Sequence, residues 1–293
     1  MNKILITGAN GQLGKKIKDL TAEIKDAEIK DIEFIFTDID ELDITDYQQV
    51  EEFTSKHKPQ IIVNCAAYTN VEQAEDDICS AYKLNSDAPR NIADISRKNN
   101  MKLIHISTDY VFDGTKNMPY SENDLTNPIS VYGKSKLDGE KHVLTENPDA
   151  LIIRTAWLYS EYGKNFALSM LKLAATKDCL NIVYDQVGTP TYAGDLAFAI
   201  LEICKKFLSE KFWAAGIYHY SNLGVCSWYD FTKAIFKIAE LKTSVNPILS
   251  CDFPTKAKRP TFSVLNKSKI INTFCINIPH WTDSLNIFYM NLY

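Results

Sequence analysis

The sequence predicts an α/β fold, with a doubly wound parallel sheet of the Rossmann type and a smaller, mixed α/β lobe. Short, continuous apolar segments in the first half are typical of strands buried on both faces. Segments of helical character alternate with them, as the crossover connections of a parallel sheet require. A glycine-rich turn, residues 8–14, follows the first apolar segment, and such sheets bind ligands beyond the carboxyl ends of their strands.

The first half supplies most of the expected sheet. We expect strands at residues 3–7, 33–38, 61–64, 102–107 and 150–154. We expect helices between them at residues 13–25, 46–56, 71–84, 87–99 and 132–147. Thr45 or Asp46 can cap the second of these helices, and Pro59 stands just beyond its end.

The pattern loosens after residue 154. Helices are expected at residues 166–177, 191–208 and 228–239, and strands at 180–184 and 216–220. The last fifty residues are mixed and contain four prolines, at positions 247, 254, 260 and 279. We therefore expect one domain at residues 1–155, completed by part of 180–222, and a second lobe at residues 156–293 that is interleaved with it.

Composition excludes several classes of protein. The chain has 293 residues, 45% of them hydrophobic and 24% charged, which is typical of a globular protein and excludes disorder and coiled coils. A net charge of -5 gives no basic field for nucleic acid, and no apolar run reaches membrane-spanning length. The first residues contain no long apolar run before a small-residue cleavage site, so we do not expect a secretory signal. Seven widely spaced cysteines without a Cys-x-x-Cys pair predict buried thiols in a reducing cytoplasm.

The turn at residues 8–14 reads Gly-Ala-Asn-Gly-Gln-Leu-Gly. Without a side chain, Gly8 can form a tight turn, Gly11 can let the backbone approach a pyrophosphate, and Gly14 can bring helix and strand close together. The helix that follows adds amide donors and a partial positive charge. The turn therefore predicts a dinucleotide-binding site, which also includes Asn10, Gln12 and Leu13.

An acidic residue, Asp38, ends the second expected strand. A carboxylate at this place commonly accepts the ribose hydroxyls of the dinucleotide, and Asp40 and Glu41 follow closely. These charges would repel a 2′-phosphate, so they favour NADH slightly over NADPH. Lys15 or Lys16 could still reach a phosphate. The alternative for Asp38 is a solvated loop acid.

Two polar motifs predict a catalytic site at the same edge of the sheet. Tyr132 and Lys136 stand four residues apart on one face of an expected helix. A free phenol has a pKa of about 10, and a neighbouring ammonium and an oxidised nicotinamide both favour the phenolate. Thr108 directly follows the fourth strand and can donate a hydrogen bond to a carbonyl oxygen beside the tyrosine. The alternatives are an amphipathic surface pair for the tyrosine and lysine, and a turn residue for Thr108.

Together these motifs resemble those of the extended short-chain dehydrogenases/reductases, with Ser-Thr-Asp-Tyr-Val-Phe-Asp-Gly at 107–114 and Val-Tyr-Gly-Lys-Ser-Lys at 131–136. Further segments resemble the dTDP-4-dehydrorhamnose reductases, a family within that group, over nearly the whole chain. They are Leu-Asp-Ile-Thr-Asp (42–46), Asn-Cys-Ala-Ala-Tyr-Thr (64–69), Tyr-Gly-Lys-Asn-Phe (162–166), Asp-Gln-Val-Gly-Thr-Pro-Thr (185–191), Ser-Trp-Tyr (227–229) and Lys-Arg-Pro (258–260).

The resemblance implies roles for particular residues. The catalytic group would be Thr108, Tyr132 and Lys136. Further residues would contact the cofactor: Asp43 and Ile44 at the adenine, and Ala66, Ala67 and Tyr68 along the pyrophosphate and ribose. Substrate-binding residues would be Asp109, Trp157, Asn165, Gln186 and Arg259. Some members carry an acid after the third glycine that helps to bind a metal between subunits. Lys15 stands there, so no metal is carried over.

The resemblance also implies a reaction, the NAD(P)H-dependent reduction of the C4 ketone of dTDP-4-dehydro-L-rhamnose to dTDP-L-rhamnose, in nucleotide-sugar and cell-surface polysaccharide biosynthesis. A nucleotide sugar would be the small-molecule partner, and the resemblance is compatible with a homodimer. The alternatives are a reductase of another nucleotide-linked 4-keto-6-deoxy sugar and a non-catalytic, dinucleotide-binding regulatory subunit. The basic cluster Lys256, Lys258 and Arg259 would suit a diphosphate, or would be a solvated loop.

Overall fold

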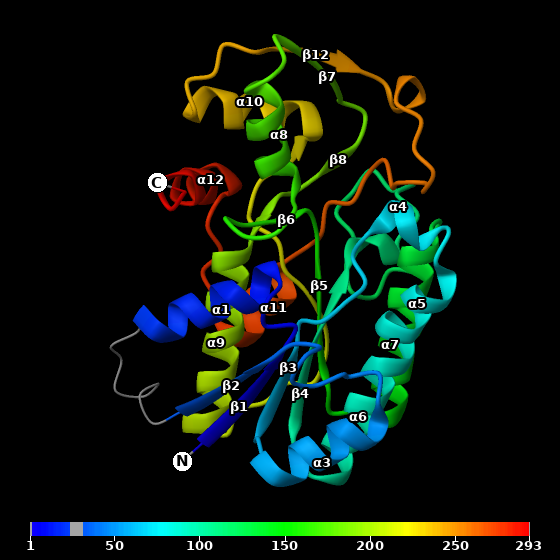
Figure 1. Cartoon of the computed structure of the whole chain (residues 1–293), viewed down its shortest axis with the longest axis vertical. Helices are drawn as coiled ribbons and strands as arrows, with labels where there is room; N and C mark the ends of the chain where they lie inside the picture. Colours follow the sequence, from blue (N-terminus) through cyan, green and yellow to red (C-terminus); the bar gives the residue numbers. More distant parts are fainter. Residues whose placement is uncertain (1, 24–31, 293) are drawn as a thin grey trace.

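A six-stranded parallel sheet forms the centre of the structure, a computed structural model that describes residues 2–23 and 32–292 (Figure 1). The strand order is β10-β5-β4-β3-β1-β2. The strands are β1 (Asn2–Thr7), β2 (Ile32–Thr37), β3 (Ile61–Asn64), β4 (Lys102–Thr108), β5 (Leu151–Thr155) and β10 (Gly216–His219). Because β10 pairs with β5 in parallel, a strand from the second half of the chain completes the sheet.

Helices cover both faces of this sheet, which confirms the doubly wound α/β class. On one face α1 (Gln12–Glu23), α9 (Ala193–Glu210) and α11 (Ser268–Phe274) pack against Ile4 and Ile6 of β1. On the other face α3 (Tyr47–His57), α6 (Ala88–Lys98) and α7 (Val131–Glu146) pack against the side chains that point the opposite way, such as Leu5 and Ile62. Side chains of β1 alternate between the two faces because a strand has a period of two, and both faces are buried.

The order of the strands sets where a ligand can bind. β1 lies between β2 and β3. The chain passes from β1 to β2 on one side, and from β3 to β4 on the other side. Such a switch point opens a crevice at the carboxyl ends of the strands. Thr7, the last residue of β1, pairs in register with Thr37 of β2 and Asn64 of β3. The loops after β1 and β3 therefore begin side by side.

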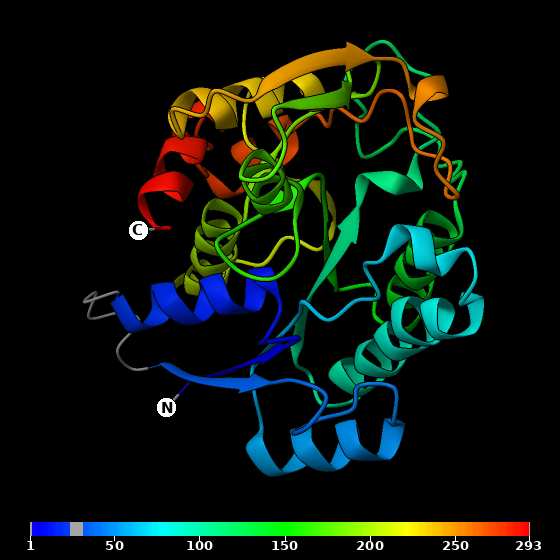
Figure 2. The same ribbon diagram turned by 45° about the horizontal axis from the view of Figure 1, so that its top comes forward.

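A smaller lobe stands beyond the carboxyl ends of the strands, at the top of Figure 1. It contains α8 (Phe166–Ala174), α10 (Trp228–Ile238) and α12 (Trp281–Met290). Three short strand pairs complete it: β7 (Cys179–Val183) with β12 (Ser244–Ile248), seen side by side in Figure 2, β6 (Leu158–Tyr159) with β9 (Thr191–Tyr192), and β8 (Val187–Gly188) with β11 (Cys226–Ser227). Its core is aromatic, with Phe231, Tyr159 and Phe288 in edge contacts.

Several expectations need correction. The single helix expected at 71–84 is broken into α4 (Val71–Ala74) and α5 (Ile78–Tyr82), because the Asp77 side chain accepts from the Ser80 amide and starts a new helix. A π-helical turn, Lys83–Asp87, then runs directly into α6. Of the helix expected at 13–25, residues 24 and 25 lie outside the described residues. Two short 3-10 turns, Asp109–Val111 and Ser250–Asp252, were not expected.

The cysteines also differ from expectation. All seven lie in the described ranges and carry free thiols, but Cys79, Cys179, Cys251 and Cys275 are exposed, and only Cys204 and Cys226 are fully buried. Within residues 2–23 and 32–292, no helix is long and apolar enough to cross a membrane.

Candidate active site

The glycine turn packs tightly against the loop that follows β3. Gly8 has a φ of +66°, and a Cβ there would lie 2.6 Å from the amide nitrogen of Ala66. A Cβ on Gly14 would lie 2.5 Å from the carbonyl oxygen of Gly8, so this glycine lets α1 begin close to the turn. Gly11 differs, because its Cβ would approach only the Gly8 oxygen, at 3.2 Å. A side chain at Gly11 would press on this one protein atom, and the rest of the space beside it is open to a ligand.

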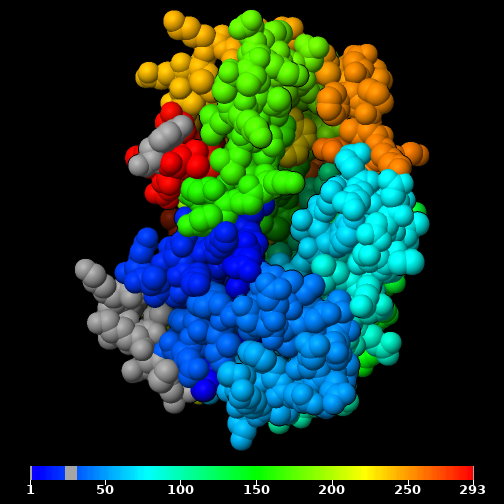
Figure 3. Space-filling model, viewed as in Figure 1, coloured from blue at the N-terminus to red at the C-terminus, as the bar shows by residue number. Residues whose placement is uncertain are grey.

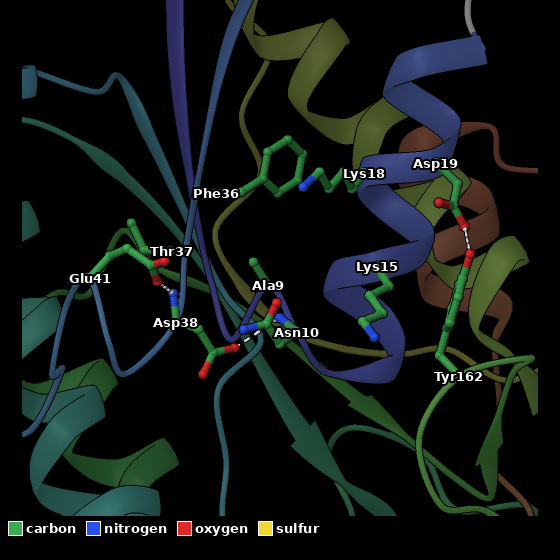
Figure 4. A pocket seen from close by; sticks show the side chains of 10 residues that line it. All are labelled: Ala9, Asn10, Lys15, Lys18, Asp19, Phe36, Thr37, Asp38, Glu41 and Tyr162. Carbon is green, nitrogen blue, oxygen red and sulfur yellow. Dashed lines mark hydrogen bonds between the residues drawn. The ribbon is translucent and has the colours of Figure 1, made fainter.

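A small pocket lies between α1 and the end of β2 (Figure 4). Asp38 Oδ2 accepts a hydrogen bond from the backbone amide of Asn10 at 2.8 Å, which ties the acid to the glycine turn. Lys15 and Lys18 also line this pocket of about 310 Å3, their ammonium groups lying near the rings of Tyr162 and Phe36. Neither lysine has a carboxylate partner among the described residues.

The expectation that Lys16 could reach a phosphate is wrong. Its side chain is almost buried on the other side of α1, where its Nζ lies 3.3 Å from Glu161 Oε2 and near the ring of Tyr192. Lys18, one turn after Lys15 on the same helical face, was not singled out from the sequence. The spacing of three residues could have identified it.

A long cleft of about 1010 Å3 runs from the glycine turn to the second lobe. Figure 3 shows a hollow between the blue α1 segment, the cyan α4–α5 segment and the upper lobe. The lining includes most residues singled out from the sequence: Gly8, Asn10, Gly11, Gln12, Leu13, Asp38, Asp43, Ile44, Ala66, Ala67, Tyr68, Thr108, Asp109, Tyr132, Lys136, Trp157 and Arg259. The structure thus brings the glycine turn together with the polar motifs that begin about 100 residues later in the sequence.

Three of the residues expected to be catalytic or to bind cofactor or substrate do not line the cleft. Gly14 stands behind the turn. The Asn165 side chain caps α8 through the Leu168 amide, and its Nδ2 donates to Gln12 Oε1 at 3.0 Å, so it contacts the cleft only through Gln12. The Gln186 side chain donates to Ser250 Oγ at 3.0 Å in the second lobe.

The start of α7 sets the position of Tyr132. Ser130 caps this helix by accepting from the Gly133 amide at 3.1 Å. A Cβ at Gly133 would collide with the carbonyl oxygen of Tyr110, so the glycine lets α7 approach the turn after β4 closely. The ring of Tyr110 then supports Tyr132 edge-on at 5.5 Å between centroids.

Burial controls the protonation of the two central groups. It raises the pKa of Tyr132 to about 12, although a hydrogen bond with Thr108 acts in the opposite direction. It lowers the pKa of Lys136 to about 8, against the charge of Glu140. Lys136 Nζ donates to the carbonyl oxygen of Ile106 at 2.6 Å and does not lower the pKa of the phenol in this structure. We expected Lys136 to favour the phenolate. Desolvation instead sets the direction of the shift.

The third group, Thr108, ends β4 beside a buried acid. Its hydroxyl donates to Asp109 Oδ1 at 3.0 Å and accepts from the Tyr110 amide at 3.2 Å. Burial raises the pKa of Asp109 to about 6, against hydrogen bonds from Ser263 and Thr108. Asp109 Oδ2 has no hydrogen-bond partner of good geometry, so a polar ligand in the cleft could satisfy it.

An aromatic wall closes the far side of the cleft. Trp157 has a positive φ of 47°, which is unusual for a bulky residue. Its ring stacks on Trp228 with 3.4 Å between centroids and 7° between planes. Both rings line the cleft and offer a flat apolar surface to a ring-shaped ligand.

The basic cluster at 256–259 is partly neutralised. Arg259 Nη2 lies 2.7 Å from Glu72 Oε1, and Lys256 pairs with Asp76. Glu72 Oε2 also accepts from the Lys256 amide at 2.9 Å, so this carboxylate joins α4 to the second lobe. Arg259 lines the cleft, and its buried Nε has no hydrogen-bond partner. This guanidinium therefore suits an anionic ligand. Lys258 has no such contact and is exposed.

Sequence reasoning missed one residue that shapes the cofactor end of the cleft. Asn85, in the π-helical turn, accepts from the Tyr68 amide at 2.8 Å and donates to the Tyr68 carbonyl at 3.0 Å. A Cβ at Gly139 of α7 would collide with the Asn85 carbonyl oxygen. An asparagine between two apolar helical segments was the available signal. In the described ranges no group of three or more His, Cys, Asp or Glu side chains gathers as metal ligands would.

The fold and the site define the chain as an extended short-chain dehydrogenase/reductase, with a glycine turn at the switch point of the sheet and a Tyr-x-x-x-Lys helix facing it. More particularly, it belongs to the family described as RmlD substrate binding domain, whose model matches residues 1–293.

Similar proteins agree over the full length. A dTDP-4-dehydrorhamnose reductase of Aggregatibacter actinomycetemcomitans is 42% identical over 291 residues, 97% of each chain. The solved structure of a dTDP-4-dehydrorhamnose reductase from Clostridium acetobutylicum has 42% identity and a TM-score of 0.91, covering 99% of both chains. That of the Bacillus anthracis enzyme, in complex with NADP, has 38% identity and a TM-score of 0.91, covering 99% of this chain and 100% of the other.

Proposed function

We propose that the chain reduces the C4 ketone of dTDP-4-dehydro-L-rhamnose to give dTDP-L-rhamnose, with NADH or NADPH as reductant. The observation that carries this proposal is that Thr108, Tyr132 and Lys136 line the same cleft as the glycine turn. The full-length similarity to dTDP-4-dehydrorhamnose reductases supports the choice of substrate. Residues 1–155 with β10 would hold the dinucleotide, and residues 156–293 the sugar nucleotide.

The residues of the cleft fit a dinucleotide cofactor. Gly11 leaves its surroundings open, Asp38 and Asp43 provide carboxylates at one end, and the Ala66–Tyr68 backbone forms a wall beside the glycine turn. When bound, the reduced nicotinamide would supply the hydride that adds to the ketone carbon. All the remaining chemistry belongs to the side chains of the protein.

Tyr132 would donate its phenolic proton to the ketone oxygen. Burial raises the pKa of Tyr132 to about 12, so the group is protonated at neutral pH and ready to donate. Lys136, held at the Ile106 carbonyl, would orient the nicotinamide ribose through its other two N–H bonds. Thr108 would turn its hydroxyl from Asp109 to the ketone oxygen as negative charge grows there. Removing such a donor typically costs about 3 kcal/mol of transition-state stabilisation.

The substrate would lie against the second lobe. Arg259, with its buried and unpartnered Nε, suits the diphosphate, and the stacked pair of Trp157 and Trp228 suits the thymine or the sugar. Asp109 would accept a sugar hydroxyl at Oδ2. Asn165 would act through Gln12, and Gln186 would need to leave Ser250 to reach the nucleotide.

For the cofactor, we propose that NADH is slightly favoured and that NADPH is also accepted. The Asn10 amide holds Asp38 at the end of β2. There its carboxylate would accept hydrogen bonds from the two hydroxyls of the adenosine ribose. Lys15 and Lys18, in the adjoining pocket, would receive a 2′-phosphate. A Bacillus anthracis relative binds NADP.

The test is turnover of dTDP-4-dehydro-L-rhamnose, followed by the loss of NADH or NADPH absorbance, with the product identified by NMR. A rhamnose product supports the proposal. A product with the opposite configuration at C4 would identify a reductase of the opposite stereochemistry, which forms the talose sugar from the same ketone. Absence of turnover with a bound dinucleotide would favour the non-catalytic regulatory subunit. Light scattering of the purified chain tests whether it is a homodimer, and fractionation of cells tests the cytoplasmic location.

A further inference from the structure

A buried ion pair lies beneath the catalytic lysine. Arg154 is the charged residue of the otherwise apolar core of β5, and Glu140 lies on α7, each with a side chain no more than 3% exposed. Arg154 Nη2 donates to Glu140 Oε2 at 2.7 Å, and its Nε donates to Oε1 at 2.9 Å. Neither residue lines the cleft, so direct contact with a ligand does not explain why two charges are kept away from water.

Glu140 links three elements, two of which carry catalytic groups. It stands four residues after Lys136, on the same face of α7. Its Oε1 also accepts from Ser107 Oγ at 2.5 Å. Ser107 pairs in register with Arg154 across β4 and β5, and it immediately precedes Thr108. One carboxylate therefore joins the strand that ends in Thr108 to the helix that carries Lys136.

The other ionisable groups around Lys136 are neutral at physiological pH. On β4, burial and the charge of Lys136 hold the pKa of His105 well below its ordinary value. Beyond β3, burial raises the pKa of Cys65 to about 12, and on α7 it raises that of Tyr132 to about 12. Glu140 is thus the carboxylate whose charge offsets the burial of Lys136.

The ionisable group beside Arg154, at the other end of the ion pair, is also neutral. His219 of β10 lies beside Arg154, with its Nε2 3.5 Å from Nη1. Burial, together with the charge of Arg154, lowers the pKa of His219 to about 3, so this imidazole is neutral and adds no second cation. Its Nδ1 faces the Tyr120 carbonyl at 3.1 Å. Arg154 therefore meets the carboxylate of Glu140 on one side and a neutral imidazole on the other.

We propose that Glu140 is a positioning residue, which through Arg154 and Ser107 keeps the ammonium of Lys136 charged and fixes its place relative to Thr108. The proposal rests on the function proposed above, in which Lys136 acts as a cation. Without Glu140, the lysine would have no anion to offset its burial, and it would lose its proton closer to neutral pH.

The first test titrates Lys136 in the cofactor-free protein, by NMR of 15N-lysine, with the signal assigned by its loss in Lys136→Met. In Glu140→Gln the titration midpoint is expected to fall by about one pH unit or more. Because this variant leaves Arg154 buried without a partner and can fail to fold, the double variant Glu140→Gln/Arg154→Met serves beside it. Removing both charges of a buried pair is commonly tolerated, and the midpoint is expected to fall there as well.

Glu146→Gln is the matched control. It makes the same substitution on the same helix and breaks an ion pair of 2.8 Å with Arg90, but at the exposed end of α7. The Lys136 midpoint should be unchanged in this variant. An unchanged midpoint in the double variant, or an equal fall in the control, would overturn the proposal.

The second test is the pH profile of kcat/KM. In Glu140→Gln and in the double variant the alkaline limb should move to lower pH, whereas a merely structural role would lower kcat/KM equally at every pH. That latter result would contradict the proposal. Since the NMR titration needs neither substrate nor cofactor, its outcome is independent of whether the proposed reaction is correct.

Discussion

Asp38 at the end of β2 is tied to the glycine turn, because its Oδ2 accepts the backbone amide of Asn10 at 2.8 Å. The acid is therefore held near the position proposed for the adenosine ribose, and Lys15 and Lys18 line the pocket beside it. We expect the double variant Lys15→Ala/Lys18→Ala to raise KM for NADPH about tenfold, equivalent to about 1.4 kcal/mol. KM for NADH should change less than about twofold. Steady-state kinetics with both cofactors checks this. An equal change for both would show that the lysines do not meet the 2′-phosphate.

The glycines of the turn should separate binding from folding. Gly14→Ala places a Cβ 2.5 Å from the Gly8 carbonyl oxygen, so we expect the free energy of unfolding to fall by about 3 kcal/mol. Gly11→Ala meets only one atom, at 3.2 Å, and should change it by less than about 1 kcal/mol. We expect Gly11→Ala instead to raise the Kd of the dinucleotide at least about tenfold. Urea unfolding and fluorescence titration measure the two effects. A Gly11→Ala protein that binds normally would refute this.

Tyr132→Phe removes the proton donor and keeps the ring. We expect kcat to fall about 10²- to 10⁴-fold, the usual contribution of a positioned acid. The Kd of the cofactor should change little, because the ring still packs against Tyr110. Tyr218→Phe is the control, since it removes a phenol that donates to the Ala214 carbonyl far from the cleft. Substantial turnover in the Tyr132 variant would argue against the assignment.

We expect the buried ammonium of Lys136 to lower the free energy of unfolding. Its pKa is about 8 in the fold, against an ordinary value of 10.5, so at neutral pH the native state carries a buried charge that the unfolded chain keeps in water. We expect Lys136→Met to be inactive but more stable at pH 7 by about 2 kcal/mol, given about 1.4 kcal/mol per pH unit and the lost hydrogen bond to Ile106.

The pH dependence gives this prediction its sign. Between pH 8 and 10.5 the native wild-type protein binds fewer protons than the unfolded chain, so its stability rises with pH. The advantage of Lys136→Met should therefore shrink over this range, and urea unfolding at several pH values measures it. A variant that is less stable than the wild type at pH 7 would contradict the prediction.

The fold class could be predicted because the signals are local. Continuous apolar strands indicate burial on both faces. The turn at residues 8–14 needs a glycine at position 8 because the backbone there has a positive φ. The break at Asp77 was less visible, since a capping aspartate inside an amphipathic pattern is also a common helical surface residue. The π-helical turn depends on Asn85 packing against Gly139, a contact between distant segments.

The candidate site shows the same limit. The position of Tyr132 and Lys136 follows from their spacing, but their protonation depends on burial, which only the assembled fold determines. Arg154 within the apolar run of β5 was a signal that could have been used, because a buried guanidinium requires an acidic partner. Which acid it meets could not be inferred, since Glu140 lies on a different element.

The position of β10 in the second half of the chain has a consequence for folding during synthesis. Leu151 of β5 pairs with Gly216, which is synthesised 65 residues later. The face of the sheet around Ile4 is covered by α9 and α11, which also come from the second half of the chain. A nascent chain that ends near residue 155 would present an unpaired strand edge and a bare apolar surface, both of which invite aggregation. We therefore expect residues 1–155 alone not to fold independently, because later segments complete the sheet and its helical cover.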